Sequence, residues 1–176
     1  MTGHTTTIRL ISPQDAAAIA DHRRRDEKAF APWEPVQPAS FYTTAGQIER
    51  IDGLLEEHRT GLTWPGVVLA GGVVIGQITV GTILRQRFLR RASVGYWIAS
   101  LFHNQGHASR ALGLVLRVMS EELDLHRAEA STRLENLASQ KALRRNGFTP
   151  CGIAHEQIFL DGAWRDGVLW ERTLGS

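Results

Sequence analysis

The chain of 176 residues has a formal net charge of +2, 43% hydrophobic residues and a single cysteine, Cys151. This length is typical of one domain with a full hydrophobic core, so residues 1–176 are expected to form a single domain. One cysteine excludes an internal disulfide, and so slight a positive charge argues against nucleic-acid binding.

The chain shows no sign of export or of membrane insertion. Its first seven residues are polar and lead into a predicted strand, unlike a signal peptide. The longest apolar run, 64–80, is interrupted by Gly71-Gly72 and by Gly76, and paired glycines between apolar runs predict a β-hairpin. We therefore expect a cytoplasmic protein without membrane contact.

The predicted elements alternate between strands and helices. Residues 6–11 form a strand, and Ser12-Pro13 then starts a helix that runs to about Arg25. Three prolines within 31–38 predict an ordered loop. The remaining elements are a helix at 44–59, hairpin strands at 67–70 and 73–81, a strand near 91–99, a helix at 106–123, a strand at 126–133, a helix at 137–146, and strands at about 152–160 and 166–173. This order predicts a mixed α/β fold with one βαβ unit in its middle.

The segment 102–112, FHNQGHASRAL, joins the strand near 91–99 to the next helix. A helix start presents backbone N–H groups without internal partners and the positive end of the helix dipole, which together suit a phosphate or pyrophosphate. An ordinary tight turn is the alternative. Arg110 opposes the dipole in the first helical turn, so it points either to a bound phosphate or to an ion pair with a surface acid. His103 and His107 straddle the turn without a third ligand, so we expect no metal.

Taken together, the residues resemble the GNAT N-acetyltransferase superfamily, specifically its RimJ/RimL-like branch, which acetylates N-terminal α-amines of ribosomal proteins. The resemblance covers nearly the whole chain and rests on the order and spacing of many short motifs: Ile8-Arg-Leu10, Pro32-Trp-Glu-Pro35, Gly76-Gln-Ile78, Gly95-Tyr-Trp-Ile98, the 103–108 loop, His126-Arg-Ala-Glu129, the Asn136 and Ser139 pair, Asn146-Gly-Phe148 and Asp161-Gly-Ala-Trp-Arg-Asp166. It implies a single GNAT-type domain with a mixed, mostly antiparallel, splayed sheet and helices on both faces. It also implies that acetyl-CoA enters where the strand at 93–99 parts from the strand at 126–133.

The resemblance further implies that backbone amides of the turn hold the pyrophosphate of acetyl-CoA. The family often has a glycine where Asn104 stands, but Asn is the non-glycine residue that best tolerates a positive φ, so the turn is expected to survive. The residues expected to bind acetyl-CoA are Trp97, Ile98, Ala99, Asn104, Gln105, Gly106, His107, Ala108, Ser109, Arg110 and Asn136. For Asn136, helix capping without a ligand is the alternative.

Acetyl transfer from a thioester to an amine requires deprotonation of the ammonium, a polarised carbonyl and a proton for the leaving thiolate. By family position Glu129 is the candidate base, and a backbone N–H near Ile98 or Ala99 would serve the carbonyl. Many GNAT enzymes have a Tyr seven residues after the position of Asn136 as the general acid, where this chain has Leu143, so Ser139 is the candidate acid by elimination. Two alternatives for the base stay open. Glu129 could instead pair with an arginine, and Glu34 could act as the base or the amine anchor.

The acceptor is expected to lie against Trp33, Glu34, Phe159 and Trp164, because exposed aromatic rings beside a carboxylate suit an amine with an apolar neighbour. Core positions for both tryptophans are the alternative. The predicted function is acetyl transfer from acetyl-CoA to the N-terminal α-amine of a protein or peptide. A small-molecule amine acceptor, such as an antibiotic or amino sugar, and a non-catalytic acyl-CoA-binding module are the competing hypotheses. The sequence leaves open whether the chain forms a homodimer.

Overall fold

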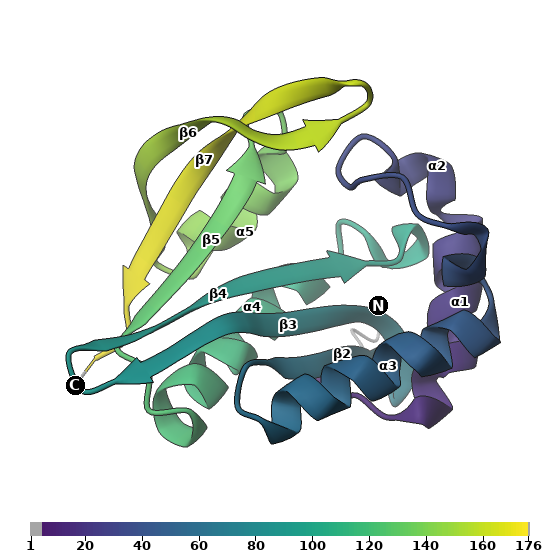
Figure 1. The fold of residues 1–176 in the computed structure, drawn as a ribbon, viewed down its shortest axis with the longest axis horizontal. Coiled ribbons are helices and arrows are strands. Elements are labelled where there is room, and N and C mark those ends of the chain that lie inside the picture. The colour runs from purple at the N-terminus through teal and green to yellow at the C-terminus, as the bar shows by residue number, and fades with distance from the viewer. Residues whose placement is uncertain (1–4, 176) are drawn as a thin grey trace.

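In the computed structural model, which describes residues 5–175, seven strands form one sheet in the order β1-β2-β3-β4-β5-β7-β6 (Figure 1). The strands are β1 (Thr6–Leu10), β2 (Trp64–Ala70), β3 (Val73–Gln86), β4 (Leu89–Ile98), β5 (Arg127–Arg133), β6 (Thr149–Leu160) and β7 (Ala163–Thr173). The α-helices are α1 (Ala16–Arg25), α2 (Glu27–Phe30), α3 (Thr44–Arg59), α4 (His107–Arg117) and α5 (Leu137–Arg145). The predicted α/β class is confirmed.

The sheet opens between β4 and β5. All neighbouring strands pair antiparallel except these two, which run parallel and pair only at 91–93 with 127–129. Beyond Ser93 and Glu129 the strands diverge, and Figure 1 shows the resulting V. The predicted splayed, mixed and mostly antiparallel sheet is confirmed.

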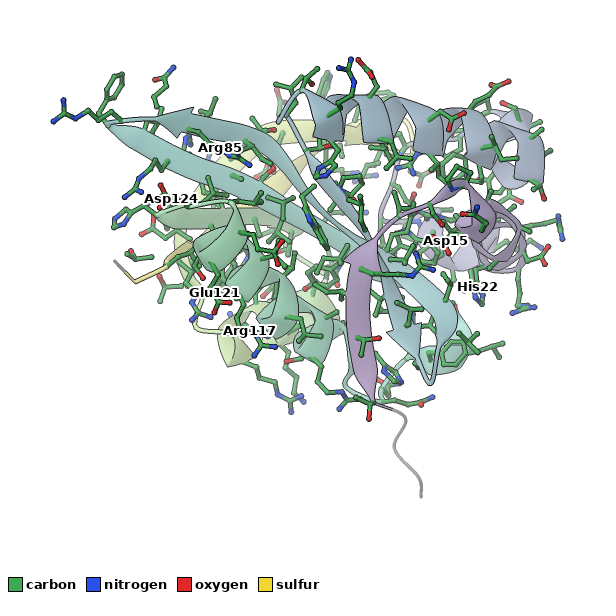
Figure 2. All side chains as sticks on the ribbon, turned by 90° about the horizontal axis from the view of Figure 1, so that it is seen from below. Asp15, His22, Arg85, Arg117, Glu121 and Asp124 are labelled. Atoms are coloured by element: carbon green, nitrogen blue, oxygen red, sulfur yellow. The ribbon has the colours of Figure 1, made fainter. Side chains whose placement is uncertain are left out.

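Helices cover both faces of the sheet. Helix α4 buries the apolar stripe Ala111, Leu112 and Val115 against one face, where the larger core lies. On the other face Ile19 of α1 and Ile51 of α3 pack with β2 and β3 in a second core. Figure 2 shows α3 and α4, the latter with Arg117 labelled, on opposite sides of the sheet. The opening between β4 and β5 therefore connects two helix-covered faces.

The observed elements differ from the predicted ones mainly at their ends. The helix predicted to reach 123 is α-helical only to Arg117, and a π-helical turn, Val118–Glu122, follows it. Strand β3 continues to Gln86 through an irregularity between Gly81 and Leu84, so the predicted hairpin is longer than expected. Within 5–175 no helix is long and apolar enough to span a membrane.

Candidate active site

A cavity of about 970 Å³ passes through the V between β4 and β5. One end is lined by the turn before α4 and by residues of α5 such as Ser139. The other end is lined by residues from the first third of the chain, including Arg23, Glu34 and Arg50. Because these groups lie on opposite faces of the sheet, two reactants entering from opposite sides would meet between the two strands.

The turn before α4 has the left-handed backbone that its sequence predicts. Gly106 is the N-cap of α4 with φ 80°, and Asn104 has φ 60°. An added Cβ on Gly106 would lie 2.9 Å from the Arg110 guanidinium, which could shift, but the positive φ would strain any residue other than glycine there. The first N–H groups of α4 have no acceptor within the helix and suit the oxygens of a pyrophosphate.

The residues predicted to bind acetyl-CoA divide into two groups. Those that line the cavity are Trp97, Ile98, Asn104, Gly106, His107, Ala108, Ser109 and Asn136. Ala99, Gln105 and Arg110 do not line it. Asn136 also caps α5, because its side-chain oxygen accepts the N–H of Ser139 at 3.1 Å, so the capping role that was left open is present.

Among residues 5–175, Arg110 does not form the ion pair with a surface acid that was one alternative for it. Its guanidinium donates to the hydroxyl of Thr6 at 2.8 Å and to the carbonyl of Gln105 at 2.6 Å. The ring of His107 is buried and lies 2.9 Å from the same Thr6 hydroxyl. These contacts attach the turn to β1, which holds its backbone in place. Three or more potential metal-ligating side chains do not cluster anywhere in the described chain.

Strand β4 directs the N–H of Ile98 into the opening. The neighbouring N–H of Ala99 already donates to the carbonyl of Ile75 in β3 at 2.8 Å. Because backbone groups of successive residues in a strand point to opposite edges, the N–H of Ile98 faces the side where β5 has diverged. Of the two candidates for polarising a carbonyl, the geometry favours Ile98.

Ser139 has a partner that the sequence did not reveal. The hydroxyl of Tyr96 lies 2.9 Å from Ser139 Oγ, and both residues line the cavity, so this hydrogen bond connects β4 to α5 across the opening. Burial raises the pKa of Tyr96, although the hydrogen bond with Ser139 acts in the opposite direction. The phenol is therefore a neutral donor at ordinary pH. The alternation of side chains along β4 predicts that Tyr96 shares a face with Val94 and Ile98. It does not predict the contact with Ser139, which lies 43 positions further along the chain.

Glu129 does not reach the cavity. It pairs with Ser93 at the closed end of the V, and the cavity lining on β5 begins at Ala130. Its carboxylate contacts Arg91 at 2.8 Å and Arg127 at 2.9 Å. Partial burial opposes ionisation, but the hydrogen bonds from these arginines outweigh it and hold the pKa of Glu129 below its usual value. Glu129 therefore forms the ion pairs with arginines that the sequence left open as an alternative to the role of base. The cause is the register, since Glu129 lies where β4 and β5 are still paired.

Glu34 is the one carboxylate that lines the cavity in the described part of the chain. Trp33 lines it too, and the guanidinium of Arg133 lies 5.7 Å from the Trp33 ring. The two other predicted acceptor residues, Phe159 and Trp164, pack against each other on the β6–β7 hairpin and are about half exposed, outside the lining. Neither Trp33 nor Trp164 is a core residue.

The arrangement of fold and site defines an acetyltransferase of the GNAT type. The family model described as acetyltransferase (GNAT) domain matches residues 6–149, and the chain belongs to this family.

The chain matches two solved structures and a further relative along most of its own length and of theirs. The RimJ of Mycobacterium smegmatis, solved in complex with CoA-disulfide, is 33% identical with a TM-score of 0.91, and the match covers 96% of this chain and 81% of that one. The ribosomal-protein-S5-alanine acetyltransferase of Vibrio fischeri is 31% identical with a TM-score of 0.91, covering 97% and 94%. The [ribosomal protein uS5]-alanine N-acetyltransferase of Escherichia coli K12 is 28% identical over 98% of this chain and 90% of its own length. The chain is thus similar to RimJ-like enzymes along nearly its whole length.

Proposed function

We propose that this acetyltransferase transfers the acetyl group of acetyl-CoA to the N-terminal α-amine of a protein, with ribosomal proteins as the acceptor class. The cavity through the V carries the proposal, because it lets a donor on one face and an acceptor on the other meet without a covalent enzyme intermediate. The names of the Vibrio fischeri relative, a ribosomal-protein-S5-alanine acetyltransferase, and of the Escherichia coli relative, a ribosomal protein uS5-alanine N-acetyltransferase, support the acceptor class.

The donor end fits acetyl-CoA. Backbone N–H groups from Gly106 to Ser109 would hold the pyrophosphate, and Lys141 and Arg145 line the same end as further cations for phosphate oxygens. The M. smegmatis relative was solved with a CoA species, which supports this assignment. When bound, acetyl-CoA supplies an activated acetyl group on a thiol leaving group.

The chain supplies groups for each of the three chemical requirements. The Ile98 N–H is positioned to hydrogen-bond the carbonyl oxygen as it gains charge. If Tyr96 donates to Ser139 Oγ, the seryl proton is left to point into the cavity, where it can protonate the leaving sulfur. Tyr96 then positions Ser139 and passes its own proton to the seryl oxygen as the seryl proton leaves, and solvent water reprotonates the phenol.

Glu34 is the candidate base because it is the carboxylate at the acceptor end. Its Oε1 accepts from Arg23 at 2.5 Å, which fixes the direction of the carboxylate and leaves Oε2 to contact an incoming ammonium. An α-amine has a pKa near 7.7–8.0, so a weak base that accepts the proton, directly or through water, suffices.

The function is tested by thiol release from acetyl-CoA. Peptides with a free N-terminus should be turned over, and the same peptides with a blocked α-amine should be inert even when they contain lysine. A panel of amino sugars and aminoglycosides serves as the comparison. Turnover of these small amines, with none of the free peptides, would contradict the proposed acceptor.

A further inference from the structure

The acceptor end of the cavity holds more positive than negative charge. Arg23 of α1 is buried and ion-paired with Glu34, and its guanidinium lies 4.3 Å from the Trp97 ring centroid. Arg50 of α3 also lines the cavity, but no carboxylate of residues 5–175 forms an ion pair with it. Arg50 is therefore a cation in the acceptor end that forms no ion pair with the described residues, although the negative charges of Glu34 and Glu57 act on it from a greater distance.

The two guanidinium groups share one aromatic ring. Arg23 lies 5.2 Å and Arg50 5.7 Å from the ring centroid of Phe41. Desolvation and then the charge of Arg23 lower the pKa of Arg50, and the charges of Glu34 and Glu57 oppose this only in part. The side chain is still accessible to solvent within the cleft. An arginine side chain stays protonated even so, and a bound anion would therefore stabilise the positive charge of Arg50.

An acceptor N-terminus brings a further positive charge into this end of the cavity. Arg133, the third arginine there, already lies 3.3 Å from Glu135 and bonds the carbonyl of Pro32. Glu34, already ion-paired with Arg23, is the one carboxylate of residues 5–175 that lines the cavity, so an ammonium that pairs with it leaves Arg50 without an ion-pair partner. An acceptor that also carries a carboxylate would pair the ammonium with Glu34 and the carboxylate with Arg50.

On the basis of the proposed function, we propose that the enzyme selects protein N-termini with an acidic side chain among their first residues, and that Arg50 binds that side chain. The phosphates of acetyl-CoA do not compete for Arg50, since the turn and the α5 cations assigned to them lie on the other face of the sheet. Arg50 is thus a specificity residue for the acceptor, and it takes no part in the chemistry.

The test compares matched peptides. Alanine-led heptapeptides carry Glu, Gln or Lys at position 2, 3 or 4, and kcat/KM is measured by thiol release at low and high salt. For the native chain we expect Glu to exceed Gln at one position by at least about fivefold, equivalent to about 1 kcal/mol, with the ratio falling as salt rises.

Substitutions of Arg50 test whether this residue causes the preference for the Glu peptide. The Arg50→Gln variant should bring the Glu-to-Gln ratio close to one, and Arg50→Glu should favour the Lys peptide. Arg59→Gln, on the same helix but paired with Glu56 at the surface outside the cavity, should keep the native ratio. Thermal melts check that each variant is folded.

Three results would overturn the inference. Equal kcat/KM for Glu and Gln peptides in the native chain refutes it while leaving N-terminal acetylation intact. A Glu preference that persists in Arg50→Gln shows that another group reads the acid. Acetylation of no free N-terminus at all would refute the proposed function and this inference together.

Discussion

Replacing Tyr96 with Phe tests the hydrogen bond that crosses the opening between β4 and β5. The change removes only the hydroxyl 2.9 Å from Ser139 Oγ and keeps the ring against the core. One hydrogen bond contributes about 0.5–1.5 kcal/mol to stability, so the variant should fold. If the pair protonates the leaving thiolate, turnover should fall by at least about 10²-fold, or about 2.7 kcal/mol of the barrier.

The assay is thiol release at saturating acetyl-CoA and peptide, with calorimetry for acetyl-CoA affinity, which should be unchanged. Ser139→Ala should lose as much turnover as Tyr96→Phe, and the double variant no more than the worse single one, because residues acting as a unit are not additive. Tyr42→Phe, which changes a tyrosine outside this cavity, is the matched control. Turnover of Tyr96→Phe within about threefold of native would refute the role assigned to this pair.

Four further substitutions address the other roles. Glu34→Gln should lower turnover by at least about 10²-fold, with partial recovery at high pH. A ratio of variant to native turnover that does not change with pH would contradict the role of Glu34 as base. Glu129→Gln should keep turnover within about threefold of native, a much smaller fall than the removal of a general base would cause. It should, however, reduce the free energy of unfolding at pH 7. Because the pKa of Glu129 is lowered on folding, this stabilisation is present above about pH 4.3 and is lost as pH falls through the folded pKa, so the two urea midpoints should converge in acid. Gly106→Val should weaken acetyl-CoA binding at least about tenfold in calorimetry, since its φ of 80° strains a β-branched residue and distorts the turn. Trp33→Ala should raise the acceptor KM and leave acetyl-CoA affinity unchanged; an unaltered KM would remove Trp33 from the acceptor site.

Local chemistry made the turn before α4 predictable. Gly106 and Asn104 are the residue types that adopt a positive φ, and both do so. Residues in a strand alternate between its two faces, and Ala128 and Ala130 of β5 accordingly share the face that packs in the core. These features depend on neighbours within a few positions, so the amino-acid sequence alone specifies them.

Long-range register decided what lies in the cavity. The resemblance named Glu129 as the candidate base, but the distance of Glu129 from the opening depends on where β4 and β5 stop pairing, and that point lies past Ser93. The Tyr96–Ser139 contact joins two segments that only the packing of α5 against the sheet brings together.

The acceptor end shows the same division. The sequence indicated an aromatic and acidic segment at Trp33 and Glu34, and both line the cavity. It could not show that Arg23 and Arg50, from two different helices, both lie near the Phe41 ring and that Glu34 pairs with Arg23. Periodicity and turn chemistry determine which helices and strands form. Tertiary packing alone determines which charges those elements bring together, because that depends on contacts between residues far apart in the chain.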